Sequence, residues 1–205
     1  PDCGIYAMGY FKIFNNSKPI KASFHGHDNF CGIVDNFFLA STIDCIAWTS
    51  AVMIPKTIFN TIGGFNENMR SIQDTDLWIR IALKYKVAFC SKPTTYKVIR
   101  YEENHLSNYA FKYDGAEIYK NFKNEEQNNL PLKKYLDFNR FSMAIECKIN
   151  GDKENYEILR KSIDKNHLNS KQKLLLIIPK IGLVFLKKVQ VWFIMINMYM
   201  TPFKN

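Results

Sequence analysis

The spacing of apolar residues changes near residue 105, and this change constrains the fold more than any other feature of the chain. Before it, short apolar runs alternate with turn signals, and after it only helical spacing recurs. We therefore expect an α/β part over residues 1–106 and an all-helical part over residues 107–205. Of the 205 residues 47% are hydrophobic, which is enough to build a core and argues against disorder over most of the chain.

The first part is expected to hold several strands and one amphipathic helix. Alternating or continuous apolar residues predict the strands, whereas Phe30, Ile33, Val34, Phe37 and Phe38 form a helical stripe. The predicted strands cover residues 4–14, 46–54, 87–89 and 95–101, and the predicted helix covers residues 29–40.

Two further helices are predicted between these strands. Pro55 opens a short helix, because the first helical position does not need an N–H group, and Gly63 with Gly64 ends it. The next helix starts near Asp74 or Asp76, either of which can cap it or place a negative charge in its first turn, and runs to about Tyr85.

The second part reads as a series of helices. Helical spacing covers residues 107–122, 131–150 and 152–165. Gly151 is expected to stop the second of these helices and Asp152 to cap the third, which makes the pair a helical hairpin.

The last 41 residues combine lysines with long apolar runs. Asp164 is the last acidic residue, and seven lysines follow it: Lys165, Lys171, Lys173, Lys180, Lys187, Lys188 and Lys204. A spanning helix needs about 20 apolar residues, but lysines, Pro179 and Gly182 interrupt the runs. We expect a helix lying on an anionic membrane surface; packing on a core or partner, and a true span, are the alternatives.

Net charge and cysteine spacing narrow the classes of protein. A formal charge of +9 indicates an anionic partner. Nucleic acid fits poorly, because the tail lysines interleave with aliphatic runs instead of forming a polar groove with stacking aromatics. The five cysteines, at 3, 31, 45, 90 and 147, contain no C-x-x-C. They argue against a zinc ribbon and fit a reducing compartment.

The most informative stretch is a glycine-rich turn followed by a carboxylate at a helix start. The sequence reads IGGFNENM at 62–69 and QDTDLWIR at 73–80. Glycine lets the backbone approach a ligand closely, and a helix amino terminus favours a negative charge. Asp74 is therefore either an ordinary helix cap or an acceptor in a binding cleft. A second polar group, His25, His27 and Asp28, is either a metal ligand set or, more simply, a polar loop.

These residues resemble the carboxyl-terminal half of the family-2 glycosyltransferases, which are inverting enzymes with the GT-A fold. The resemblance covers about residues 1–107 and rests on motifs in family order: WTSAVMI at 48–54, GGFNE at 63–67, DTDLWIR at 74–80, YKVIRY at 96–101 and NHLS at 104–107. It implies a partial GT-A fold followed by an appended helical region.

The resemblance also implies roles for single residues. Asp74 takes the position of the catalytic base, which removes a proton from an acceptor hydroxyl as that hydroxyl attacks the sugar. Gln73 stands where the family has glutamate. On the acceptor side the resemblance places Gly63, Gly64, Phe65, Gln73 and Trp48, although Trp48 is also read as a core residue. Asp76, Trp78 and Arg80 are read as structural, and His105 as a metal or diphosphate ligand or a loop histidine.

The resemblance further implies a donor site outside this chain. The family binds its nucleotide sugar, with Mg²⁺ or Mn²⁺, through an amino-terminal βαβ half. We expect no part of the present sequence, which starts at Pro1, to correspond to that half. We therefore expect this chain alone to be inactive. The full enzyme would transfer a sugar to a glycan or lipid-linked acceptor on the cytoplasmic face of a bacterial plasma membrane. The alternative is a non-catalytic membrane- or partner-binding module with a degenerate motif.

Overall fold

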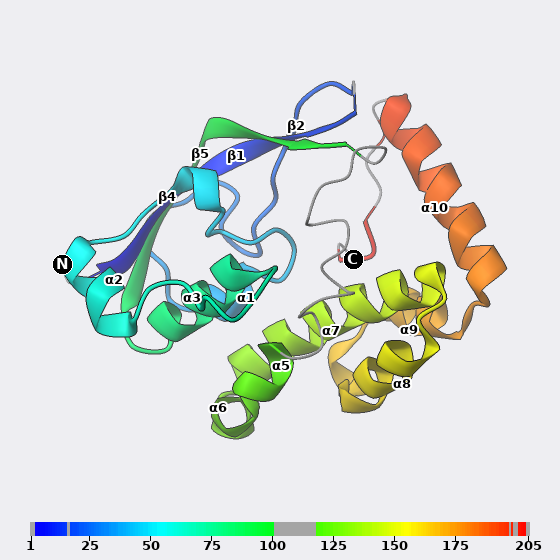
Figure 1. Cartoon of the computed structure of the whole chain (residues 1–205). Helices are drawn as coiled ribbons and strands as arrows, with labels where there is room; N and C mark the ends of the chain where they lie inside the picture. The colour runs from blue at the N-terminus through cyan, green and yellow to red at the C-terminus, as the bar shows by residue number, and fades with distance from the viewer. Residues whose placement is uncertain (1–2, 16, 101–117, 197, 199–200, 204–205) are drawn as a thin grey trace. The chain divides into compact units, whose positions relative to one another are not determined.

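The computed structural model describes residues 3–15, 17–100, 118–196, 198 and 201–203. It is a mixed α/β structure in two compact units, Pro1–Ser107 and Asn108–Asn205. The first unit contains the strands and the second is built of helices (Figure 1).

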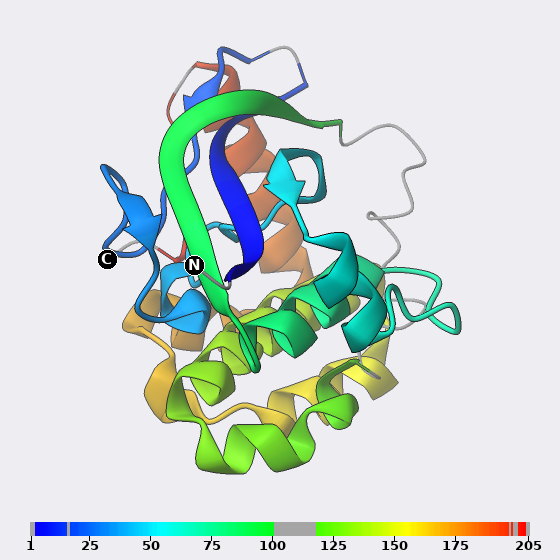
Figure 2. The ribbon, with the colours of Figure 1, turned by 90° about the vertical axis from the view of Figure 1, so that its left-hand side faces the viewer.

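Two long strands, β1 (Cys3–Phe14) and β5 (Lys86–Ile99), form the centre of the first unit. They pair in parallel along their whole length and curl together (Figure 2). Three short strands complete the sheet. β2 (Ile20–Lys21) and β4 (Val52–Met53) pair antiparallel with β1, and β3 (Cys31–Ile33) pairs antiparallel with β5.

The strand pair departs from the expected pattern because of a bulge. The sequence predicted two strands at 87–89 and 95–101, but β5 is continuous through Pro93. The register shifts on both sides of the pair Gly9–Pro93, and Ser91, Lys92 and Thr94 have no register partner on β1. Such an irregularity is where a strand tolerates proline. Only glycine fits at position 9, since a Cβ there would lie 2.4 Å from the Ser91 carbonyl oxygen.

Two other predictions for this unit were wrong. Residues 29–40 are not one helix, because β3 takes the first part and α1 (Phe37–Ala40) only the last turn. The Phe30 carbonyl accepts from Ser91 N–H at 2.8 Å, so sheet pairing outweighs the helical spacing. Residues 46–54 hold only β4 and a 3₁₀ turn, Thr49–Ala51, instead of a long buried strand.

The two helices that precede β5 follow the sequence signals closely. α2 (Lys56–Ile62) starts after Pro55 and ends at Gly63, which adopts φ 90°. α3 (Gln73–Ala82) buries Leu77, Trp78, Ile79 and Ile81. It packs on β1 at Gly4, where a Cβ would lie 2.4 Å from the Ile81 side chain.

The second unit packs around one long helix, α7 (Leu130–Asn150). The short helices α5 (Ile118–Asn121) and α6 (Lys123–Asn128) precede it, whereas residues 107–117 of the predicted helix at 107–122 lie outside the described residues. As predicted, Gly151 ends α7 with φ 85° and Asp152 caps α8 (Lys153–Ser162).

The tail forms α9 (Ser170–Ile177) and α10 (Lys180–Met195), separated at Pro179. Pro179 interrupts the run as expected, but Gly182 does not, because it lies inside α10. Among the described residues, no helix combines the length and the apolar character that crossing a bilayer requires.

Candidate functional site

The glycine-rich turn holds the loop that leads to Asp74. The N–H of Gly63 bonds to the Asn60 carbonyl and that of Gly64 to the Phe59 carbonyl, while Gly64 adopts φ 66°. Left-handed backbone of this kind suits glycine, which explains the pair. Phe65 is 42% exposed and its ring lies 5.7 Å from that of Phe59, so it lies at the surface of this turn.

Arg80 ties this turn to helix α3. Its Nε donates to Asp76 Oδ2 at 2.7 Å, its Nη1 to the Ile62 carbonyl at 2.9 Å and its Nη2 to the Gly64 carbonyl at 2.7 Å. Asp76 is only 3% exposed. These contacts confirm the structural reading of Asp76 and Arg80, and they fix the end of α2 against the side of α3.

The residue before α3 has a strained backbone. Ile72 occupies the cap position with φ 55° and ψ 21°, and its side chain makes no capping bond. A β-branched residue rarely adopts this conformation, which costs on the order of 1–3 kcal/mol and is concentrated at functional sites. Of the two roles that the sequence allowed Asp74 and Asp76, the structure shows the second, because both lie in the first turn of the helix, where they place negative charge, and neither is its cap.

One carboxylate oxygen of Asp74 accepts hydrogen bonds from within α3, and the other accepts one from Thr49, which lies outside the helix. Thr75 N–H donates to Oδ1 at 2.7 Å, and the Thr49 hydroxyl donates to Oδ2 at 3.0 Å. The side chain is half-buried. The Thr75 hydroxyl also donates to Oδ1, at 3.4 Å. A carboxylate has about four acceptor positions, so these three bonds leave room for one further hydroxyl.

The neighbours of Asp74 come from two distant segments. Gln73 donates through Nε2 to the Met69 carbonyl at 2.7 Å, so its amide supports the loop. Trp48, next to Thr49, is half-buried with its ring 5.1 Å from that of Tyr10. Of the residues predicted for the site, Gly63, Gly64 and Phe65 therefore lie on the turn before Asp74, Gln73 is the first residue of α3, and Trp48 is linked to Asp74 through Thr49.

The histidine predictions have different outcomes. His105 lies outside the described residues. In the other group, His27 Nδ1 bonds to the His25 carbonyl at 2.7 Å and Asp28 accepts from Phe24 N–H at 2.7 Å. These bonds hold a polar loop. Across the described parts of the chain, no three His, Cys, Asp or Glu side chains are grouped as metal ligands.

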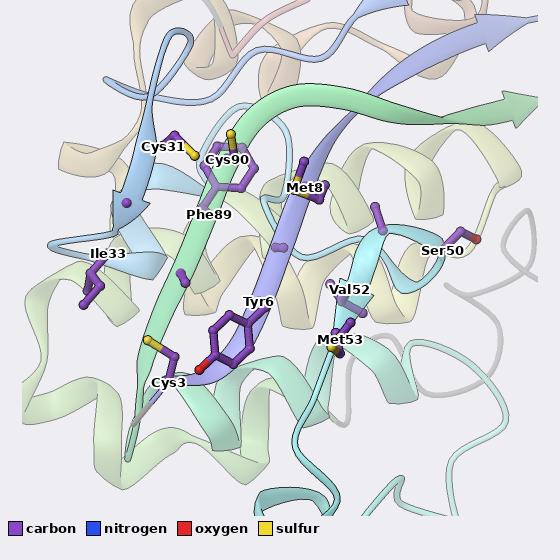
Figure 3. Close-up of a pocket in the computed structure, with 14 residues that line it drawn as sticks. Cys3, Tyr6, Met8, Cys31, Ile33, Ser50, Val52, Met53, Phe89 and Cys90 are labelled. Atoms are coloured by element: carbon purple, nitrogen blue, oxygen red, sulfur yellow. The ribbon is translucent and has the colours of Figure 1, made fainter. Parts of the chain in front are cut away.

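A pocket of about 550 Å³ opens on the sheet of the first unit (Figure 3). Its walls are mainly apolar and come from β1, β3 and β5 and from residues 50–53, which directly follow Thr49. Tyr6, Met8, Ile33 and Met53 line it, together with Cys31 and Cys90. No sequence pattern indicated this pocket, because it arises from strand pairing between distant segments.

The roles of Thr49 and Ile72 were likewise not predictable from the sequence. Thr49 lies in the 48–54 motif but is 25 residues from Asp74, so only the fold reveals the bond. Ile72 looks like an ordinary apolar residue, and its strain is visible only in the backbone angles. Comparison with known proteins adds no assignment, since no protein-family model, curated protein or solved structure matches the chain.

Proposed function

We propose that this chain is the acceptor-side half of an inverting glycosyltransferase, with Asp74 as the catalytic base. The observation that carries the proposal is a half-buried carboxylate at the start of α3, two residues after the strained Ile72 and bonded across the site by Thr49. Strain at this position is the kind of cost that a functional constraint explains. The motif resemblance at residues 48–107 supplies the reaction class.

In the proposed reaction Asp74 accepts the proton of an acceptor hydroxyl. That oxygen attacks the anomeric carbon of the sugar while the bond to the nucleoside diphosphate breaks on the opposite side, and the configuration inverts. Thr49 holds the Asp74 carboxylate in place through its hydroxyl bond. Arg80 fixes the glycine turn, so that Phe65 and the loop form the acceptor side.

The proposal assigns the nucleotide sugar and its Mg²⁺ or Mn²⁺ ion to a further βαβ half. The described residues do not fit a metal site, since no group of three candidate ligands occurs there and Asp76 is engaged by Arg80. The reaction proposed for these residues therefore has no step at a metal ion. The donor sugar and the glycan or lipid-linked acceptor would meet at the edge of α3.

The test is sugar transfer by the full-length gene product that contains this chain. Nucleotide release would be measured with a panel of UDP-, GDP- and dTDP-sugars and a lipid extract as acceptor. Asp74→Asn keeps the Thr49 bond but loses the base, and we expect a rate loss of 10²–10⁴-fold. Asp35→Asn, at an exposed loop position, is the matched control and should retain the rate.

Two outcomes would contradict this proposal. Transfer by Asp74→Asn within tenfold of the parent rate would show that Asp74 is not the base. A product with retained anomeric configuration would exclude a single displacement. The 205-residue chain alone is expected to show no transfer with any donor.

A second candidate, a module that docks on an anionic membrane surface, is favoured by α10. Ile181, Phe185, Trp192 and Met195 are exposed, Ile181 by 85%. Their spacing of four, seven and three residues puts them on one helix face. Lys188 lies on the same face, and no acidic residue follows Asp164. An apolar stripe with lysines and no carboxylates matches an anionic bilayer surface.

Vesicle binding tests this candidate with the whole chain. Sedimentation with phosphatidylglycerol vesicles should show binding that weakens in salt and with phosphatidylcholine. Each lysine near the surface contributes about 1 kcal/mol, so Lys180→Gln/Lys188→Gln should weaken binding roughly 30-fold. The control Lys153→Gln/Lys161→Gln, on exposed positions of α8, should bind like the parent.

The same variants distinguish the glycosyltransferase proposal from the membrane-docking proposal. Asp74→Asn should abolish transfer and leave vesicle binding unchanged. If both lysine pairs weakened binding equally, general charge and not α10 would be responsible. A peripheral location on the inner face of the plasma membrane follows only if the α10 variants alone lose binding.

A further inference from the structure

Cys31 and Cys90 lie directly opposite each other on neighbouring antiparallel strands. β3 pairs with β5 so that Cys31 faces Cys90 and Ile33 faces Ala88. Both residues line the pocket, and Figure 3 shows their side chains together at one end of it. The two positions are far apart in the sequence, so the pairing arises from the sheet alone.

The hydrogen-bond pattern determines how close the two cysteines are. Ser91 N–H donates to the Phe30 carbonyl at 2.8 Å, and Val34 N–H donates to the Val87 carbonyl at 2.9 Å. Hydrogen-bonded pairs alternate with non-hydrogen-bonded pairs along an antiparallel ladder. Counting from these two bonds puts Cys31 and Cys90 at a non-hydrogen-bonded pair, where Cα atoms are about 4.5 Å apart. This separation is within the range of about 4.4–6.8 Å that disulfides need.

The two thiols already interact and are accessible. Cys31 is exposed and Cys90 is half-buried. The hydrogen bond between the two side chains raises the pKa of Cys31 and lowers the pKa of Cys90; a backbone N–H bond from Lys92 adds to the lowering at Cys90. The thiolate is the nucleophile in disulfide exchange, so Cys90 is the attacking residue and Cys31 the resolving one.

We propose that Cys31 and Cys90 form a redox modification site, which low-molecular-weight disulfides convert to a cross-strand disulfide. The Cys90 thiolate attacks one sulfur of the small disulfide, breaks its S–S bond and releases one thiol. Cys31, after losing its proton, then attacks the Cys90 sulfur and releases the second thiol. The protein loses two protons and two electrons, and the small disulfide gains both as two thiols.

This site is compatible with a reducing compartment. Exposed or strained disulfides have higher reduction potentials than structural ones, so they open again when thiols predominate. A cross-strand bond would connect the edge strand β3 to β5 across one wall of the pocket. The inference does not depend on the proposed glycosyltransferase activity, because neither cysteine is placed in the Asp74 site.

The other three cysteines provide internal comparisons. Cys3 and Cys147 are buried, and burial raises the pKa of Cys147 to about 12. Burial around the Cys45 sulfur likewise raises its pKa. All three should therefore react slowly, and an oxidised chain should keep them as thiols.

Mass spectrometry of the whole chain, treated with glutathione disulfide and then mapped by proteolysis, tests the proposal. The parent should lose two hydrogens and yield one cross-linked peptide pair that contains Cys31 and Cys90, and dithiothreitol should reverse this. Cys31→Ser should instead carry a glutathione adduct on Cys90. The matched variant Cys147→Ser should form the cross-link as fully as the parent.

Any of three results would overturn the proposal. They are a parent chain that retains all five thiols, one that gains glutathione without an internal cross-link, and one whose cross-links scatter over several cysteine pairs. Circular dichroism before and after oxidation distinguishes an altered fold from a local bond. If the cross-link forms only after the spectrum of the folded chain is lost, the sheet register is not its cause.

Discussion

Replacing Arg80 with methionine tests whether one guanidinium holds the glycine turn to α3. The substitution removes three hydrogen bonds, to Asp76, the Ile62 carbonyl and the Gly64 carbonyl. It also leaves the Asp76 carboxylate, which is 3% exposed, without its cation. Removing one partner of a buried ion pair costs about 3–5 kcal/mol.

The expected magnitude is smaller, because the Arg80 side chain is 26% exposed and water can reach part of the space it leaves. We expect Arg80→Met to lower the free energy of unfolding by about 2–3 kcal/mol, which raises the unfolding equilibrium constant roughly 30- to 150-fold. Arg80→Lys keeps a charge for Asp76 but cannot reach both carbonyls, so it should cost about half as much.

Urea unfolding followed by tryptophan fluorescence is the assay. A Trp192→Phe background leaves Trp48 and Trp78, both in the first unit, as the reporters. Lys84→Met removes an exposed positive charge just after the end of the same helix and should change stability by less than about 0.5 kcal/mol. If Arg80→Met came within 1 kcal/mol of this control, the reasoning about the buried Asp76 charge would be refuted.

Three further predictions concern other parts of the chain. Gly9→Ala puts a Cβ 2.4 Å from the Ser91 carbonyl oxygen and should cost about 3 kcal/mol or prevent folding, as thermal unfolding would show. Asp137→Ala removes a fully buried carboxylate that accepts from four donors and should cost about 3–5 kcal/mol by urea unfolding followed by circular dichroism. Iodoacetamide should label Cys90 at a lower pH than it labels an ordinary thiol, because the pKa of Cys90 is lowered. Cys147 should stay unlabelled until about pH 12. Equal labelling rates of these two cysteines at pH 7 would contradict both assignments.

Local signals predicted those elements whose ends are set by single residues. Pro55, Gly63, Gly151 and Asp152 act through their own backbone angles or capping bonds, so they mark the same helix ends in the structure as in the sequence. The short apolar runs were less informative. Residues 29–40 have helical spacing, yet strand pairing with β5 decides their conformation, because the sheet offers bonds that periodicity does not reveal.

The residues of the candidate site likewise divide into those that local patterns predicted and those that only the fold reveals. The motif at 63–80 pointed to Asp74 and its neighbours, and the contacts of Asp76 and Arg80 follow from their i, i+4 spacing on a helix. The Thr49 bond and the opposition of Cys31 and Cys90 join residues 25 and 59 positions apart. No local pattern encodes such pairs in a single sequence.

The sequence by itself determined the division into an α/β part and a helical part, the caps and stops of several helices, and the basic, acid-free tail. These follow from periodicity, backbone preference and charge, which act between near neighbours. Only the tertiary structure decided which strands pair, how β5 passes Pro93, where the pocket opens and which side chains face Asp74. Such contacts depend on sheet register, and a shift of one residue would turn every strand side chain to the opposite face.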